Sequence, residues 1–271
     1  RPRVLARLSL AREDISAREI SSLAWSADGR MLLVAADEFV QLWDVVEGAR
    51  LKHYHRGRDP VLAVAWVPGT SRFLAGGLDG EVSMWDVEDG YLFSWPTGRV
   101  NAICVAARGT HVVALVKEGH LVVLDLDLAK ERDNCWSVEL GGRASGVALS
   151  DDGRYALVNM QVDSEMQLWD LQAGMMTRSY AGHTQLRYAL RSCFGGARQA
   201  FVAIGSEDCR VRIWHRASGS RVATLSGHAA VVNDVSWSPT HPGLLASASD
   251  DHTVRLWAWA PDRADGDWAV A

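Results

Sequence analysis

The stretch that decides the fold is Gly227 to Trp257, GHAAVVNDVSWSPTHPGLLASASDDHTVRLW. It contains three short runs of apolar and β-branched residues, at 231–237, 244–249 and 253–257. Ser-Pro and the turn at 241–243 separate the first two runs, and Asp250-Asp251 separates the last two. Short β-rich runs with turn residues between them predict an antiparallel meander.

The same layout recurs upstream, with an acidic turn residue six positions before the residue that ends the third run. The pairs are Asp37/Trp43, Asp79/Trp85, Glu118/Leu124, Asp163/Trp169, Asp208/Trp214 and Asp251/Trp257. The ends of these repeats lie 39 to 45 residues apart, and three of them carry a Trp-Asp dipeptide, beginning at Trp43, Trp85 and Trp169. Period and dipeptide resemble WD repeats, in which four strands make one propeller blade. Six repeats in register argue against chance repetition.

The resemblance implies an all-β fold, a WD40-type β-propeller with six visible four-stranded blades, and leaves a seventh blade open for the full-length protein. We expect one domain over 1–271, with blades at 20–56, 61–97, 100–141, 144–181, 187–226 and 231–257. The segment 3–10, RVLARLSL, resembles the outer strand RVATLS at 221–226. We therefore expect strand 3–10 to close the last blade, because closure removes an exposed sheet edge. Residues 258–271 are expected to be a C-terminal tail.

Four residues of the last repeat occupy the positions where WD repeats usually place a hydrogen-bonded tetrad: His228, Ser247, Asp251 and Trp257. Such a network satisfies polar groups that burial would otherwise leave unpaired. A Ser/His/Asp set could also be catalytic, but repeat register already predicts this one and no nucleophile turn accompanies it. The preceding repeat has His183, Asp208 and Trp214, with Ile204 in place of the hydroxyl.

Loops that enter the first strand of a blade carry arginine in five of six repeats: Arg18, Arg58, Arg99, Arg143 and Arg187. Because blades repeat radially, these side chains are expected to form a partial basic ring. The ring would suit an acidic, phosphorylated or C-terminal carboxylate ligand. The alternative is that loop arginines are simply common, because the basic residues of this chain are almost all arginine.

Composition indicates a soluble globular protein, with 48% hydrophobic residues and a formal net charge of −5. This charge argues against nucleic acid as the main partner. Without a long apolar run or a secretory segment, we expect no membrane association and a cytoplasmic or nuclear location. The scattered cysteines Cys104, Cys135, Cys193 and Cys209 are expected to be reduced thiols, and we expect no metal and no cofactor.

The last two repeats resemble a narrower family, the Gid-seven type WD-repeat subunit of the GID/CTLH E3 ubiquitin ligase. The matching residues are Gln185, Tyr188, 191–196, Phe201, 205–208, 214–216, 227–228, 232–233, 236–237 and 246–251. Family members usually have a further blade at the start and LisH and CTLH helical segments before the propeller. Here only the segment 3–10 matches such a blade and no such helical segment is seen, so a fragment and a protein without that assembly module both stay open.

This resemblance implies a non-catalytic scaffold or substrate-recruiting subunit of a ubiquitin ligase that promotes proteasomal degradation of its targets. Its partners would be proteins or peptides, acidic ones among them, together with ligase subunits. The alternative is a general WD-repeat scaffold, or an acidic or phosphopeptide reader, outside the ubiquitin pathway. We do not expect an enzyme, because no convergent acids, metal cluster or nucleophile with its base appears beyond what repeat register explains.

Overall fold

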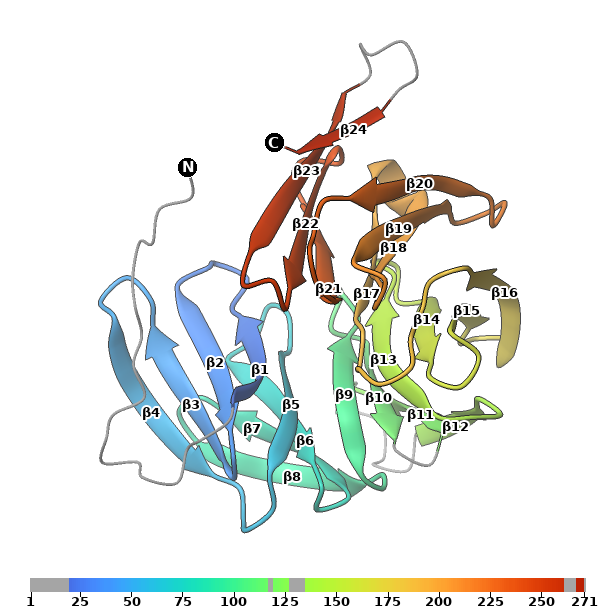
Figure 1. The fold of residues 1–271 in the computed structure, drawn as a ribbon. Helices are drawn as coiled ribbons and strands as arrows, with labels where there is room; N and C mark the ends of the chain where they lie inside the picture. Colours follow the sequence, from blue (N-terminus) through green and yellow to red (C-terminus); the bar gives the residue numbers. More distant parts are fainter. Residues whose placement is uncertain (1–19, 117–118, 127–134, 261–266, 271) are drawn as a thin grey trace. The chain divides into compact units, whose positions relative to one another are not determined.

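The computed structural model describes residues 20–116, 119–126, 135–260 and 267–270, and Figure 1 shows their strands. The chain divides into two compact parts, an N-terminal part of residues 1–139 and a C-terminal part of residues 140–271. The described residues form six four-stranded antiparallel sheets, numbered here in chain order, and a single short 3-10 turn. The predicted all-β class with six visible four-stranded blades is therefore confirmed, and the architecture is that of WD40-type blades.

The N-terminal part contains the first three sheets, each with its strands in sequence order. The first sheet consists of β1 (Ile20–Trp25), β2 (Met31–Ala36), β3 (Phe39–Asp44) and β4 (Ala49–His55). The second consists of β5 (Val61–Trp66), β6 (Arg72–Gly77), β7 (Glu81–Asp86) and β8 (Gly90–Pro96). The third consists of β9 (Val100–Val105), β10 (His111–Val116), β11 (His120–Asp125) and β12 (Cys135–Glu139).

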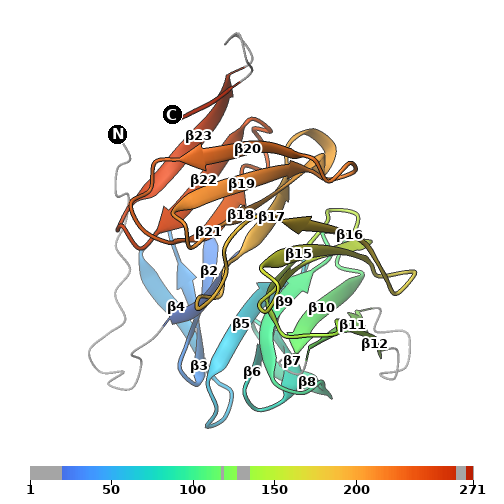
Figure 2. The same cartoon turned by 45° about the vertical axis from the view of Figure 1, so that its right-hand side comes forward.

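The C-terminal part contains the other three sheets, which Figure 2 shows from a second side. The fourth sheet consists of β13 (Ala144–Leu149), β14 (Tyr155–Met160), β15 (Glu165–Asp170) and β16 (Met175–Ala181). The fifth consists of β17 (Ser192–Gly195), β18 (Phe201–Gly205), β19 (Arg210–His215) and β20 (Arg221–Ser226), with the 3-10 turn η1 (Ala197–Gln199) between β17 and β18. The sixth consists of β21 (Val232–Trp237), β22 (Leu244–Ser249), β23 (Val254–Ala260) and β24 (Asp267–Val270).

Burial along the strands explains why many of them are apolar without alternation. The second strand of each of the first four sheets has five consecutive buried residues. In the second sheet neighbours of the N-terminal part cover both faces, because Phe73 packs with the first sheet and Leu74 with the third. The outer strands β4 and β16 instead bury one residue each, Tyr54 and Tyr180. Each of these tyrosines donates its hydroxyl hydrogen to a backbone carbonyl of the next sheet, at Val87 (2.9 Å) and Arg216 (2.7 Å). Burial raises the pKa of both hydroxyls to about 12.

Apolar clusters hold neighbouring sheets together within each part. In the N-terminal part, one cluster joins the first and second sheets around Leu33 and Phe73, and another joins the second and third around Leu74 and Val112. In the C-terminal part, Leu157 and Phe194 belong to the cluster between the fourth and fifth sheets, and a further cluster joins the fifth and sixth. Because one small sheet cannot hide both faces alone, stacking of repeats supplies the core.

The C-terminus differs from the sequence-based expectation. Strand β23 runs past Trp257, and β24 pairs with it antiparallel, with Val270 opposite Trp257. Strand β24 is therefore the fourth strand of the sixth sheet. The expectation that residues 258–271 form a tail is wrong for 258–260, which belong to β23, and for 267–270, which form β24. The predicted closing strand 3–10 lies outside the described residues. Pairing with a segment nearby in sequence closes only a short stretch of chain, so its entropic cost is small. The Pro- and Asp-bearing sequence that starts at Pro261 is typical of a tail and gives no sign of this pairing.

No helix within the ranges described above has the length and apolar character needed to cross a membrane. The same residues contain no group of three His, Cys, Asp or Glu side chains placed to hold a metal ion. The four cysteines all lie within these ranges, and no disulfide joins any of them. Burial raises the pKa of the Cys193 thiol to about 12, so this side chain stays protonated at neutral pH.

Candidate functional site

The four tetrad residues of the sixth sheet are joined by hydrogen bonds in one continuous chain, in the order Asp251, His228, Ser247 and Trp257. His228 Nδ1 lies 2.8 Å from Asp251 Oδ2, and His228 Nε2 lies 2.7 Å from Ser247 Oγ. The indole N–H of Trp257 donates to the same Ser247 oxygen at 2.8 Å. A carboxylate only accepts, so Nδ1 carries the hydrogen, and a neutral ring then accepts the Ser247 hydroxyl at Nε2. Every polar atom of this buried chain is thus engaged.

The Asp251 carboxylate is the anchor of the tetrad. It accepts from the Thr253 hydroxyl at 2.6 Å, from the Thr253 backbone N–H at 2.9 Å and from the Ala229 backbone N–H at 3.0 Å. The Thr253 hydroxyl hydrogen bond is the largest of the causes that hold the pKa of Asp251 well below its usual range. Because the hydroxyl of Ser247 is buried and bonded on both sides, the arrangement fits a structural role for this Ser/His/Asp set.

Three other sheets satisfy the equivalent indole N–H differently. Trp43 donates to Gln41 Oε1 at 3.1 Å, Trp85 to Ser83 Oγ at 2.9 Å, and Trp169 to Gln167 Oε1 at 3.0 Å. Each of these acceptors lies two residues before its tryptophan on the same strand, whereas Ser247 lies on the neighbouring strand. Tryptophan therefore recurs at this position in five of the six repeats, but these three sheets and the sixth sheet satisfy its indole N–H from different strands.

In the second sheet an arginine takes the place of the tetrad histidine. The Arg56 side chain is 4% exposed, and its Nη2 lies 2.9 Å from the Asp79 carboxylate. Its Nε donates to Ser83 Oγ at 2.7 Å, the oxygen that also accepts from Trp85. Asp79 and Trp85 are the landmark pair of this repeat, so Arg56 completes a four-residue network that the sequence pattern did not reveal.

The fifth sheet separates the histidine from its expected acid. Asp208 accepts two hydrogen bonds from the Arg212 guanidinium, which lower the pKa of the carboxyl group to about 2. His183 is buried, and no well-formed hydrogen bond reaches either ring nitrogen among the described residues, although the Gln185 side chain lies near enough to act on the ring. Burial and, after it, the charge of Arg212 lower the pKa of His183 to about 4. The His183–Asp208 pair of the repeat pattern therefore does not form.

Four of the five predicted binding arginines lie in the described residues, and all four are exposed: Arg58, Arg99, Arg143 and Arg187. Each precedes the first strand of a sheet. Arg58 and Arg99 belong to the N-terminal part and Arg143 and Arg187 to the C-terminal part, while Arg18 lies outside the described residues. The ring that would join all of them stays a prediction.

Entry loops meet the acidic turns of the preceding sheet, as the repeat register requires. The Val61 N–H donates to the Asp37 carbonyl oxygen at 2.6 Å, which ties β5 to the β2–β3 turn. The Ser164 hydroxyl donates to the Gln185 carbonyl oxygen at 2.9 Å, which ties the loop before β17 to the β14–β15 turn. Entry loops and acidic turns therefore share one end of the sheets in each part.

The entry loop of the fifth sheet is built around one carboxylate. Glu207 Oε1 accepts the backbone N–H groups of Leu186 at 2.6 Å, Arg187 at 2.7 Å and Tyr188 at 3.1 Å. Although partial burial acts to raise the pKa of Glu207, these three donors outweigh it and lower the pKa overall. Since three successive amides converge on one charged oxygen, the loop backbone is held in a single conformation.

The buried side chain of Gln185 also fixes this entry loop. The Gln185 side chain is fully buried, and its Nε2 donates to Ser145 Oγ at 2.6 Å and to the Tyr188 carbonyl oxygen at 3.1 Å. The loop then presents outward Leu186, which is 71% exposed, Arg187, and Tyr188, which is 43% exposed. We call these three residues the display loop. A rigid loop that exposes an aliphatic, a basic and an aromatic side chain is suited to contact another protein.

Comparison with known proteins agrees with this geometry. Residues 219–258 match the family model described as WD domain, G-beta repeat, and residues 5–68 match the anaphase-promoting complex subunit 4 WD40 domain. The chain belongs to the WD40-repeat family.

Several named proteins are similar along most of this WD40-repeat chain. A WD repeat-containing protein 26 homolog of Arabidopsis thaliana is 36% identical over 245 residues, which are 89% of this chain and 41% of the relative. GID complex subunit 7 of Schizosaccharomyces pombe is 34% identical over 215 residues, 78% of this chain and 42% of the relative. A WD repeat-containing protein 26 homolog of Drosophila melanogaster is 33% identical over 247 residues, with shares of 90% and 39%. The chain spans less than half the length of each.

Within this WD40-repeat chain, sequence reasoning named Arg187 as a site residue but missed Leu186, Tyr188 and Glu207. Gln185, Tyr188 and Glu207 do stand among the residues that resemble the Gid-seven type family. The signal was therefore present as a family pattern, but the pattern did not say that Glu207 caps the loop and that Tyr188 faces solvent. Only the hydrogen bonds from the three backbone amides reveal that division of roles.

Proposed function

We propose that this protein is a non-catalytic subunit of a GID/CTLH-type ubiquitin ligase that binds other proteins and promotes the proteasomal degradation of a target. One of its relatives carries the name GID complex subunit 7 and is 34% identical over most of this chain. Ubiquitin transfer would be performed by other subunits. The proposed location is the cytoplasm, the nucleus or both.

The observation that carries the proposal is the display loop. Leu186 is largely exposed, yet the backbone beneath it is tied by three charge-assisted hydrogen bonds to Glu207. Because the loop is already rigid and its apolar side chain already faces water, little conformational entropy of the loop is lost when a partner binds. Aromatic residues and arginine are also the types that dominate the binding energy of protein interfaces. The loop is therefore proposed as a contact for a target or for a neighbouring subunit.

Exposed arginines at the entry loops add a proposal about the charge of the bound partner. Arg58, Arg99, Arg143 and Arg187 stand before the first strands of four sheets on a protein whose net charge is −5. A local basic surface on an acidic protein favours an acidic, phosphorylated or carboxylate-ended peptide. Charge reversal at Arg99 and Arg143 together is expected to weaken such binding, and the loss should shrink at high salt.

The experiment is an affinity purification of the full-length tagged protein from its own cells, with quantitative identification of the retained proteins. We expect ligase subunits of the RING and CTLH type with the wild type. A Leu186→Ser, Tyr188→Ser double variant should lose at least one retained protein, while Val46→Ser, at a 76% exposed site of the N-terminal part, should lose none. Absence of ligase subunits from the wild-type sample would overturn the proposal and favour an interaction module outside the ubiquitin pathway.

A further inference from the structure

A second surface lies at the other end of the fifth sheet, where η1 connects β17 to β18. Arg198 and Gln199 both have left-handed backbones, with φ of 55° and 53°. Two successive non-glycine residues in this region are uncommon and store strain, which the surrounding contacts must offset. Gln199 Oε1 accepts the Asp151 N–H at 2.9 Å, so the turn is tied to the fourth sheet. The turn forms a ridge with a groove on each side.

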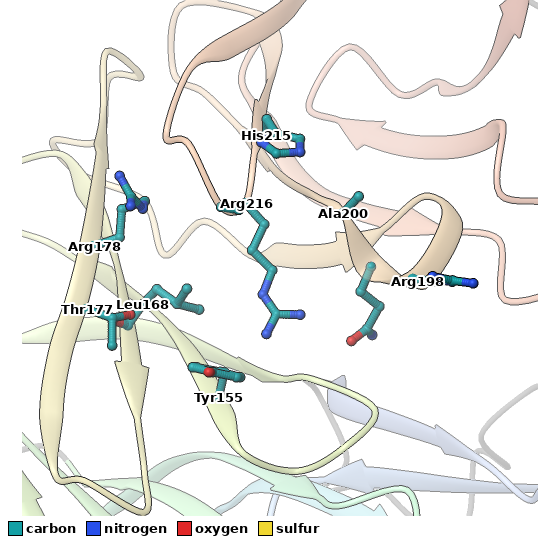
Figure 3. Close-up of a pocket in the computed structure, with 10 residues that line it drawn as sticks. Tyr155, Leu168, Thr177, Arg178, Arg198, Ala200, His215 and Arg216 are labelled. Atoms are coloured by element: carbon teal, nitrogen blue, oxygen red, sulfur yellow. The ribbon is translucent and has the colours of Figure 1, made fainter.

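The groove on the side of the fourth sheet is basic. It has a volume of about 430 Å³, and its lining includes Arg178, Arg198, His215 and Arg216 but no carboxylate. Figure 3 shows the Arg216 guanidinium extending into the groove above Tyr155, with Arg178 on one side and the η1 turn with Arg198 on the other. Arg178 and Arg198 therefore line the groove on opposite sides of Arg216, and Arg178 Nη1 also donates to the Ser218 carbonyl oxygen at 3.1 Å.

Arg216 is held in place mainly by aromatic contacts rather than by an ion pair. Its guanidinium lies over the rings of Tyr155, at 4.6 Å from the centroid, and Phe194, at 5.3 Å. Its backbone N–H donates to the Ala200 carbonyl oxygen at 2.7 Å. Asp152 is near enough to interact electrostatically, but no ion pair joins Arg216 to a carboxylate within the described residues. Stacking therefore orients the guanidinium while its N–H groups remain available to an anion.

The groove on the side of the sixth sheet is apolar. It has a volume of about 390 Å³ and is lined by Ala197, Phe201, Ile213, Val222, Trp237, Pro242, Gly243 and Trp259. Phe201 and Trp237 stack with their centroids 6.0 Å apart and form one wall. Val222 and Trp259 stand at its mouth and are 48% and 44% exposed. Ala197 lines this groove and Arg198 lines the basic one. Because the two residues are consecutive, their Cα atoms lie roughly 3.8 Å apart, and the two grooves meet at this peptide bond.

We propose that the two grooves form one composite site for a segment of a partner protein that carries a phosphorylated side chain close to a bulky apolar one. A phosphate brings about −1.5 to −2 charges and three acceptor oxygens, which match several guanidiniums better than one carboxylate does. The apolar side chain would cross the ridge and enter the second groove. Such a site is distinct from the display loop, because η1 follows the end of β17 and the display loop precedes its start.

Fluorescence anisotropy with labelled peptides tests the proposal on the purified chain, without any ligase subunit. The probe is a pool of Gly/Ser-background peptides, each with one phosphoserine and one leucine two to five residues apart. Matched pools carry serine or glutamate in place of phosphoserine, or alanine in place of leucine. We expect the phosphoserine-leucine pool to bind at least tenfold more tightly than the serine and alanine pools, with affinity falling as salt rises.

Variants of the two grooves locate the binding. Arg216→Ala and Arg198→Glu should each weaken it at least tenfold, and Val222→Ser should remove the preference for leucine. Arg198 is exposed, so its variant keeps the test valid even if Arg216→Ala disturbs folding. Arg108→Glu, at an exposed site of the N-terminal part, is the control that should bind as the wild type. Equal binding of the glutamate pool, no binding of the phosphoserine pool, or unchanged affinity in Arg198→Glu and Arg216→Ala would overturn the proposal.

Discussion

The guanidinium of Arg212 holds the carboxylate of Asp208 through two hydrogen bonds, at 2.9 and 2.5 Å. Asp208 is the acid that the repeat pattern pairs with His183, so its bonding to Arg212 leaves His183 without that partner. The imidazole of His183 is left buried against Trp214, with ring centroids 6.3 Å apart, and the positive charge of Arg212 acts on it. A histidine in this setting favours its neutral form, so folding and protonation of His183 oppose each other.

Stability should therefore fall as the pH is lowered from 6.5 to 4. The folded pKa of His183 is lowered to about 4 from 6.5, so its contribution is fully present above pH 6.5 and is lost as the pH approaches 4. The total loss in the free energy of unfolding is about 3 kcal/mol, because each unit of difference between the folded and unfolded pKa corresponds to about 1.4 kcal/mol. Urea unfolding between pH 4 and 7 measures it. His183→Gln should flatten this dependence, whereas His241→Gln, at an exposed site, should leave it unchanged; equal slopes in both variants would refute the assignment.

Glu207→Ala should loosen the display loop without unfolding the protein. The variant removes the one oxygen that accepts from Leu186, Arg187 and Tyr188, and hydrogen bonds to charged groups contribute roughly 1.5–3 kcal/mol each. We expect amide hydrogen exchange of these three residues to become about tenfold faster or more. Glu47→Ala, which removes an exposed carboxylate from a turn of the N-terminal part, is the control. Unchanged exchange in Glu207→Ala would show that Gln185 alone fixes the loop.

Arg56→Met should destabilise the second sheet. The substitution leaves the partly buried Asp79 carboxylate without its cation and removes the Arg56 donor to Ser83. Breaking a fully buried ion pair costs about 3–5 kcal/mol, and we expect about 2 kcal/mol because Asp79 is 26% exposed and solvent screens its charge. Urea unfolding measures the loss, with Arg58→Met at an exposed site as the control. If Asp79→Asn in the Arg56→Met background costs as much as it does alone, the two side chains are not coupled.

Arg56 and Arg58 also show what the sequence could and could not predict. The 39-to-45-residue period located all six sheets together with the six-residue spacing from an acid to a tryptophan, or to Leu124 in the third repeat, because every repeat must bury its faces against its neighbours. The pattern could not tell that Arg56 turns inward to Asp79 while Arg58, two residues later, remains in water. Loop side chains choose their partners in three dimensions, and sequence spacing does not constrain that choice.

The same limit applies to the end of the chain and to the grooves. Strand β24 belongs to a Pro- and Asp-bearing sequence that resembles a tail, and its pairing with β23 is visible only as backbone register. The basic groove gathers Arg178, Arg198 and Arg216 from three different loops and strands. None of these spacings repeats along the chain, so periodicity carries no information about them. The repeats predict the scaffold, and the parts that depart from the repeats make the candidate sites.

Ser247→Ala tests whether the tetrad is structural. The variant removes the acceptor of the Trp257 indole N–H and the partner of His228 Nε2, both of which are buried. A buried polar group left unsatisfied costs about 1–3 kcal/mol, so we expect a loss of about 2 kcal/mol or more in the free energy of unfolding. Ser179→Ala, at an exposed site on β16, should stay within about 0.5 kcal/mol of the wild type.

The direction of the Ser247→Ala effect separates the two roles that a Ser/His/Asp set can play. Removing a structural serine lowers the free energy of unfolding. Partner binding is then weakened only because a larger fraction of the chain is unfolded. A catalytic serine would leave stability nearly unchanged and would abolish a reaction instead. Because His228 already accepts from Ser247 while Trp257 donates to it, the hydroxyl has no free path to a substrate. A Ser247→Ala protein as stable as the wild type would contradict the structural role and reopen the catalytic one.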